Sequence, residues 1–262
     1  MLRVALSRRM KDWQTVRPLY YGWFLSSLDS QLLLSRARHV LRLSLTVPTF
    51  LKDLVTWAGS DRAEDIVNLY TRDNISSGLT CHSTARFVGK SDVDENPEET
   101  DLLGTVSELT VAGFILTPRT FGARLILSSA QLAVYRQNDT EPFSLPAQHS
   151  RQGGRRPKET VEPAEPEYSS LEGSLREVEG PGLDMLGGER GRRAHITLGC
   201  AGHNRPVQTG VDQLEVLRQL ETTDQRETVT FQEGSVTKSG NSGWVITLNS
   251  PIKVSSLYTG SY

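Results

Sequence analysis

The amino-acid sequence predicts an antiparallel α+β domain. Short β-prone runs occur along most of the chain, whereas apolar residues recur at helical spacing in only a few places. Turn residues, as in residues 117–122, join successive strands directly. Because a parallel wound sheet needs a helix at nearly every crossover, this order of elements favours antiparallel pairing. The 262 residues are expected to form a single domain, residues 1–262.

The amino-terminal part predicts a strand followed by two helices. Residues 19–25 are aromatic and β-prone and predict the strand. A helix is predicted next, ending before Pro48, from apolar residues at helical spacing: Leu33, Ala37, Val40 and Leu41. A second, shorter helix is predicted from a similar group: Phe50, Leu51, Leu54 and Val55. Further strands are predicted at residues 78–88, 106–117 and 124–127.

A change of composition separates the two halves of the chain. Residues 138–191 are rich in Pro, Gly, Glu, Ser and Arg, and few apolar residues there are spaced to form a buried face. Such a segment cannot bury enough apolar surface to offset the entropy lost on ordering. The sequence therefore predicts a disordered insertion at residues 138–191 of the single domain.

The carboxyl-terminal part predicts strands around one helix. Residues 193–199 read as a strand, and Val211, Leu214 and Leu217 supply the apolar stripe of a helix. Thr209 followed by Asp212 resembles a helix cap with an acidic third residue. Three more strands are predicted, with a hairpin turn at residues 241–243: residues 227–231, 244–248 and 252–257.

Composition limits the classes of function. Lys and Arg number 29 against 31 Asp and Glu, so a nucleotide site would have to be built locally rather than by overall charge. The start of the chain lacks the apolar run of a signal peptide, and no stretch approaches the ~20 apolar residues that span a bilayer. With two cysteines, Cys81 and Cys200, we expect a reduced, cytoplasmic protein.

A short pattern that could carry chemistry occurs once in each half of the chain. His82 and Thr84 lie two residues apart in one predicted strand, and His195 and Thr197 do so in another. Side chains two apart share a face of a strand, so each strand would present an imidazole beside a hydroxyl. Two imidazoles can act as acid and base in phosphodiester cleavage, while hydroxyls bind the phosphate oxygens.

Other interpretations of these residues stay open at this point. A single histidine followed two residues later by threonine (H-x-T) is common in strands. Two ordinary strand histidines would also produce the pattern. The sequence has no dense cluster of His, Asp and Glu, so neither a metal nor a cofactor is expected.

The surroundings of the two motifs resemble a known family. HSTARF and HITLGC both fit the H-x-[ST]-x-x-hydrophobic signature of the two-histidine (2H) phosphoesterases. RRAHITLGCAG and PVQTGVDQLEVLRQ are similar to the 2′,3′-cyclic-nucleotide 3′-phosphodiesterases and their regeneration-induced homologues. PLYYGWFL, FILTPRTFGARLILS and the final 20 residues resemble the same family in the same order.

The resemblance implies a bilobal fold, in which two antiparallel sheets face a central cleft with helices outside. It implies hydrolysis of nucleoside 2′,3′-cyclic phosphates to 2′-phosphates. His195 would be the base that activates water and His82 the acid that protonates the leaving 3′ oxygen. Thr84 and Thr197 would hold the phosphate.

The resemblance also implies four substrate-binding residues. Arg193 matches an arginine that orders the cleft, and Phe87 and Tyr20 match aromatic residues near the base. Val207 matches a loop residue that contacts the active-site water through its backbone.

The resemblance leaves partners and two alternative functions open. Longer members of the family carry a P-loop domain and a lipidated cysteine box, and neither motif occurs in this chain. We therefore expect a monomer that binds 2′,3′-cyclic nucleotides, with membrane attachment only through a lipidated tail that this chain lacks. One alternative is a cyclic phosphodiesterase or ligase-like enzyme acting on RNA 3′ ends. The other is an adaptor that binds RNA, membrane or cytoskeleton and has weak activity.

Overall fold

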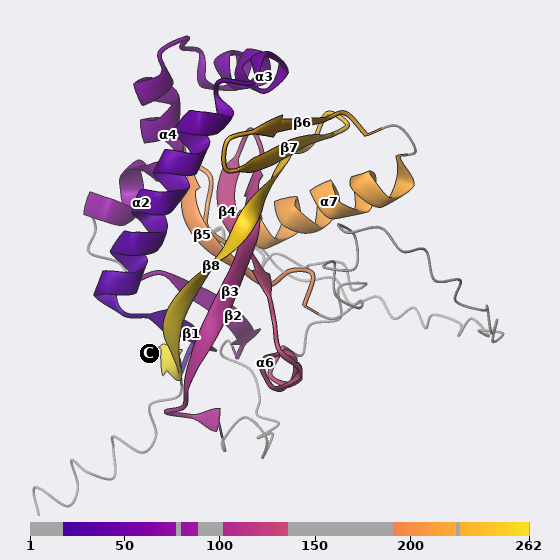
Figure 1. The fold of residues 1–262 in the computed structure, drawn as a ribbon. Helices are drawn as coiled ribbons and strands as arrows, with labels where there is room; N and C mark the ends of the chain where they lie inside the picture. Colours follow the sequence, from indigo (N-terminus) through magenta and orange to yellow (C-terminus); the bar gives the residue numbers. More distant parts are fainter. Residues whose placement is uncertain (1–17, 77–79, 89–101, 136–190, 224–225, 262) are drawn as a thin grey trace, which may run out of the picture. The chain divides into compact units, whose positions relative to one another are not determined.

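The fold is described from a computed structural model, which places residues 18–76, 80–88, 102–135, 191–223 and 226–261. The strands are β1 (Tyr20–Leu25), β2 (His82–Phe87), β3 (Val106–Leu116), β4 (Thr120–Ile126), β5 (His195–Cys200), β6 (Thr228–Phe231), β7 (Gly234–Ser239) and β8 (Gly243–Ser261). The helices are α2 (Ser27–Ser44), α3 (Pro48–Ala58), α4 (Ala63–Ser76), α6 (Ser129–Ala133) and α7 (Gln208–Thr222). Figure 1 shows these elements in chain order.

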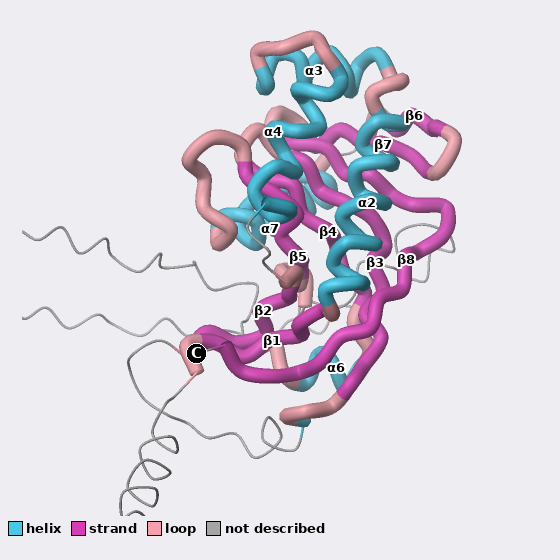
Figure 2. The backbone as a smooth tube through the Cα atoms, turned by 90° about the vertical axis from the view of Figure 1, so that its left-hand side faces the viewer, coloured by secondary structure: helices cyan, strands magenta, loops and turns pink. Residues whose placement is uncertain are grey.

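All eight of these strands belong to one antiparallel sheet. Its main path runs β2-β1-β8-β3-β4-β5, and β7 pairs with both β8 and β6. The long strand β8 connects the two ends of the sheet because one half pairs with β7 and the other with β1. The end strands β2 and β5 approach each other in space, although five pairings separate them along the path (Figure 2).

Two different helix layers cover the two faces of the sheet. Helices α2 and α4 pack on one face, where α2 contacts β8 and β1 and α4 contacts β5. Helix α7 packs on the opposite face against β4, β5, β7 and β8. Alternation along β3 explains the division: Phe114 and Leu116 point to the α2–α4 side, whereas Ile115 packs with Val216 of α7.

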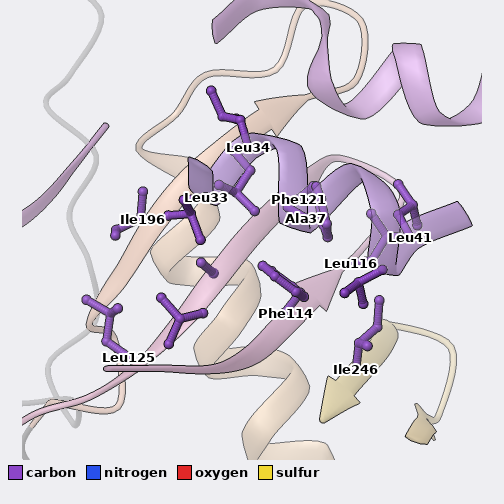
Figure 3. Close-up of a cluster of buried hydrophobic side chains, with 14 of the residues drawn as sticks. Leu33, Leu34, Ala37, Leu41, Phe114, Leu116, Phe121, Leu125, Ile196 and Ile246 are labelled. Atoms are coloured by element: carbon purple, nitrogen blue, oxygen red, sulfur yellow. The ribbon is translucent and has the colours of Figure 1, made fainter. Parts of the chain in front are cut away.

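The main core lies between the sheet and helices α2 and α4. Leu33 and Ala37 of α2 are fully buried beside Phe114 and Phe121 of the sheet (Figure 3). Ile196 also belongs to this cluster. Because Ile196 points into the core, strand alternation directs its neighbours His195 and Thr197 to the other face.

The α+β class predicted from the sequence is confirmed. The two sheets expected from the family resemblance are joined here into one continuous sheet, because β8 pairs along its length with strands of both ends. Most predicted strands and the first two helices occur close to their predicted positions.

Several predicted elements need correction. Helix α4 and strand β7 were not predicted, and β4 begins at Thr120, inside the predicted turn. The two predicted final strands form the single strand β8. Pro251 is tolerated there because the register to β3 shifts between the Gly113–Thr247 and Val111–Ile252 pairs, so no regular ladder is interrupted.

The start of α7 also differs from the prediction. The cap residue is Val207 rather than Thr209, and it makes no side-chain capping hydrogen bond. Thr209 lies inside the helix, where both it and Asp212 bond to strand and hairpin groups. The predicted insertion at residues 138–191 lies outside the described residues, except for Gly191. None of the described helices is long and apolar enough to cross a membrane.

Candidate active site

The structure brings the two H-x-T motifs together at the ends of the sheet. His82 and His195 are the first residues of β2 and β5, the two end strands that approach each other. The imidazoles lie close enough for a positive charge on His82 to lower the pKa of His195. Residues 113 positions apart in the chain thus meet in one site.

His195 is held in one orientation by its backbone and by α7. Its Nδ1 lies 2.6 Å from the carbonyl oxygen of Arg193. Since a carbonyl oxygen only accepts hydrogen bonds, Nδ1 carries the hydrogen, and in the neutral ring Nε2 keeps its lone pair. Gly210 of α7 lies against the imidazole, where an added Cβ would come within 2.8 Å of Cε1. Glycine at this position lets the helix approach the imidazole closely.

Aromatic rings pack against His82. Tyr20 and Phe24 of β1 stack on the imidazole, with ring centroids 5.2 and 5.1 Å away. Phe24 is the direct cross-strand partner of His82. Nδ1 of His82 lies 3.4 Å from the carbonyl oxygen of Thr80, which makes Nε2 the nitrogen available for proton exchange.

Burial lowers the pKa of both histidines. For His82, loss of hydration is the main cause, and the bond to the Thr80 carbonyl opposes it. For His195, loss of hydration again leads, the bond to the Arg193 carbonyl opposes it, and repulsion from His82 lowers the pKa further. Both imidazoles therefore favour the neutral form more strongly than a histidine in water does.

The two threonines sit in different surroundings. Thr84 is exposed, and its cross-strand neighbour on β1 is Gly22. The hydroxyl of Thr197 donates to the hydroxyl of Thr209 at 3.0 Å, and the Pro206 carbonyl is an alternative acceptor at 3.3 Å. Thr197 is thereby tied to the first turn of α7, whose partial positive charge favours a nearby anion.

A buried carboxylate fixes the start of α7 beside the site. Asp212 accepts hydrogen bonds from the hydroxyls of Thr117 (2.8 Å) and Thr120 (2.7 Å) in the β3–β4 hairpin. Arg119 donates to it at 2.6 Å, and Gln208 donates at 3.0 Å. The Asp212 side chain is 0% exposed. These bonds connect the hairpin to the helix turn that contacts His195 and Thr197.

The four predicted substrate-binding residues lie around this centre. Tyr20 stacks on His82, and Phe87, its cross-strand partner, is 54% exposed. Val207, predicted as a loop residue, is the cap of α7. Arg193 contributes its carbonyl to His195, and its side chain is partly buried.

Other residues that shape the site were missed from the sequence. Phe24 was not predicted as a site residue, although its spacing from Tyr20 places both on one strand face. Gly210 carries no pattern that distinguishes it from an ordinary helix residue, and Asp212 was predicted only as part of a helix cap. Their roles depend on how α7 packs on the sheet.

Within the described residues, no group of three or more His, Cys, Asp and Glu side chains is placed to hold a metal ion. Cys81 and Cys200, which flank the two motifs, are both buried.

The chain resembles known proteins over most of its length. The sequence profile described as 2′,3′-cyclic nucleotide 3′-phosphodiesterase (CNP or CNPase) matches residues 17–165 and 184–262. Proteins named 2′,3′-cyclic-nucleotide 3′-phosphodiesterase from Pongo abelii and Rattus norvegicus are 29% and 26% identical to it over 252 residues. That alignment covers 94% of this chain and 50% of each relative, so the chain spans about half the length of these curated relatives. The gap in the profile match, residues 166–183, lies within the predicted insertion.

Proposed function

Because this chain belongs to the 2′,3′-cyclic nucleotide 3′-phosphodiesterase family, we propose that it hydrolyses nucleoside 2′,3′-cyclic phosphates to 2′-phosphates without a metal ion. The observation that carries the proposal is the pair of imidazoles on β2 and β5, each with Nδ1 bonded to a backbone carbonyl. This leaves both Nε2 atoms available to exchange protons with substrate.

The proposed reaction uses one imidazole as base and the other as acid. Neutral His195 accepts a proton from water through Nε2 as the water oxygen attacks phosphorus. The bond between phosphorus and the 3′ oxygen breaks, and protonated His82 donates a proton to that oxygen. The products are a 2′-phosphate and a free 3′-hydroxyl. Repulsion between the imidazoles supports this division because it disfavours the state with both protonated.

Thr84 and Thr197 are proposed to bind the non-bridging phosphate oxygens. Their hydroxyls would donate hydrogen bonds as negative charge grows on these oxygens. For Thr197 this requires the hydroxyl hydrogen to turn from Thr209 to the phosphate. The first turn of α7, to which Thr197 is bonded, adds a favourable field for the anion. Tyr20 and Phe87 are proposed to stack on the nucleobase of the substrate. Stacking of this kind accepts any nucleobase, because every nucleobase has a π-face.

The direct test is turnover of 2′,3′-cyclic AMP by the purified chain, with the product identified by chromatography. Formation of adenosine 2′-phosphate is expected. Formation of the 3′-phosphate would reverse the assigned leaving group, and absence of turnover with a folded protein would contradict the proposal.

Thr84→Ala and Thr197→Ala are each expected to lower kcat by about 10–100-fold, because each removes one hydrogen bond to a charged phosphate oxygen and such bonds usually contribute this much. Thr→Ser variants, which keep the hydroxyl, should retain most activity. Steady-state kinetics on the four variants checks this. Equal losses for Ala and Ser would show that the methyl group, not the hydroxyl, matters.

The pH dependence of turnover should be bell-shaped, because one imidazole must be neutral and the other charged. The pKa values of both histidines are lowered in the free protein, so the maximum of kcat/KM should lie below the ordinary histidine value of ~6.5. A bound phosphate anion favours protonated imidazoles, so the maximum of kcat should lie at higher pH. The two limbs of this pH profile report apparent pKa values of the coupled histidine pair, and neither limb belongs to a single histidine.

Rates measured from about pH 5 to 9 check this, with circular dichroism confirming the fold at each pH. A kcat/KM that rises with pH without turning over is the signature of a different base and would contradict the two-imidazole mechanism.

Removal of divalent metal ions should leave the rate unchanged, because the proposed base is an imidazole. The measurement is turnover after dialysis against EDTA, with and without added Zn²⁺ or Mg²⁺. Loss of activity that returns with metal would point instead to a metal-bound hydroxide.

A further inference from the structure

Arg124 lies next to His195 on the same face of the sheet. It is the direct cross-strand partner of His195 between β4 and β5. Its neighbours Ala123 and Leu125 are buried in the α2–α4 core, so alternation directs Arg124 to the opposite face with His195. Directly opposed residues of an antiparallel pair have Cβ atoms about 5 Å apart, well within the length of an arginine side chain.

The guanidinium of Arg124 has no counter-ion in the described part of the chain. The side chain is partly buried, and loss of hydration alone lowers its pKa. Asp212, the buried carboxylate of α7 beside the site, pairs with Arg119 instead. Partial loss of hydration without a counter-ion has a cost, which an anion bound at this point would offset.

Two neighbours of Arg124 on this face are glycines. Its partner on β3 is Gly113, and Gly122 lies two residues earlier on β4. Neither has a side chain that could accept a hydrogen bond from the guanidinium. The groups that share this part of the face are His195, Thr197 and the first turn of α7, which is the proposed phosphate site.

We propose that Arg124 is a phosphate-binding residue of this site, whose guanidinium pairs with a substrate phosphate when the nucleotide binds. This inference rests on the proposed function. An anion with two or more oxygens matches the planar fork of arginine and supplies the missing counter-charge. The phosphate is either the 2′,3′-cyclic phosphate itself or the 5′-phosphate of the same nucleotide, as at an RNA 3′ end.

The first test compares stability and phosphate binding in Arg124→Met. Removing an unpaired, partly buried charge should leave the melting temperature unchanged or raise it. Affinity for adenosine 2′-phosphate, measured by titration calorimetry, should fall about 10–100-fold. Arg36→Met is the matched control, because Arg36 is an exposed arginine on α2 that pairs with Glu233. Its affinity should equal that of the unaltered chain.

The second test identifies the phosphate. KM and kcat are measured for 2′,3′-cyclic AMP with and without a 5′-phosphate. Similar losses on both substrates in Arg124→Met would assign the contact to the cyclic phosphate. A loss confined to the 5′-phosphorylated substrate would assign it to the 5′-phosphate.

A melting temperature lowered by Arg124→Met, together with unchanged affinity and kinetics, would make Arg124 structural and overturn the inference. If Arg124→Met does not fold, the Arg124→Lys variant provides the test, because it keeps the charge but lacks the planar guanidinium. It should bind adenosine 2′-phosphate with intermediate affinity. Full affinity would count against the inference. The binding experiment requires no turnover. Arg124-dependent phosphate binding in a chain that hydrolyses no cyclic nucleotide would therefore contradict the proposed function and leave this inference standing.

Discussion

His195→Ala and His82→Ala are each expected to lower kcat for 2′,3′-cyclic AMP by at least about 10²–10⁴-fold, the usual contribution of a general acid or base. Without His195 the proposed base for the attacking water is lost. Without His82 the departing 3′ oxygen leaves as an alkoxide. Both rings sit at the starts of end strands with only backbone bonds to their Nδ1 atoms, so the folded state should survive.

The measurement is steady-state turnover together with thermal unfolding of each variant. His39→Ala is the matched control, because His39 is an exposed histidine on α2 that pairs with Glu233. Its kcat should match that of the unaltered chain. Near-native turnover by either site variant would remove that histidine from the mechanism.

Asp212→Ala is expected to reduce the free energy of unfolding by about 3 kcal/mol, in the range seen when one partner of a buried polar network is removed. The hydroxyls of Thr117 and Thr120 would lose their acceptor, and Arg119 would lose its closest partner. Because the same bonds hold the first turn of α7 against the sheet, kcat should also fall. Asp212→Asn keeps acceptor capacity and should lose less.

Urea denaturation and kinetics on the same samples check this second prediction. Glu64→Gln is the control, because Glu64 forms an ion pair with Arg42 that is exposed to solvent and therefore contributes little to stability. An Asp212→Ala variant as stable as the control would show that the network does not anchor α7. Lowered stability with unchanged kcat would show that the Asp212 network stabilises the fold without affecting catalysis.

Much of the local structure was predictable because short-range rules decide it. The aromatic run in β1 and the alternation around His82 and His195 are strand signals, and all three segments form strands. Apolar spacing also located α2, α3 and α7. Helix α4, which was not predicted, carries a similar signal, because Ile66, Val67 and Tyr70 recur at helical spacing and all three are fully buried.

Other features depend on pairing between distant segments. The single strand β8 could not be deduced, because Pro251 normally marks a break and only the shifted register to β3 accommodates it. The order of Thr209 and Asp212 predicted a helix cap, but in the structure both side chains bond to residues outside α7. Their partners Thr197 and Thr117 are supplied by β5 and by the β3–β4 hairpin, and spacing along α7 says nothing about either.

By itself, the sequence determined the α+β class, the strand identity of both H-x-T motifs and the family. Each of these depends on residue order within a few positions or on similarity along the whole chain. Only the tertiary structure decided that β2 and β5 meet, that α7 brings Gly210 against His195, and that Arg124 lies beside His195 with no counter-ion among the described residues. The physical reason is that these relations arise from sheet closure and helix packing, which join residues far apart in the chain and leave no periodic trace in it.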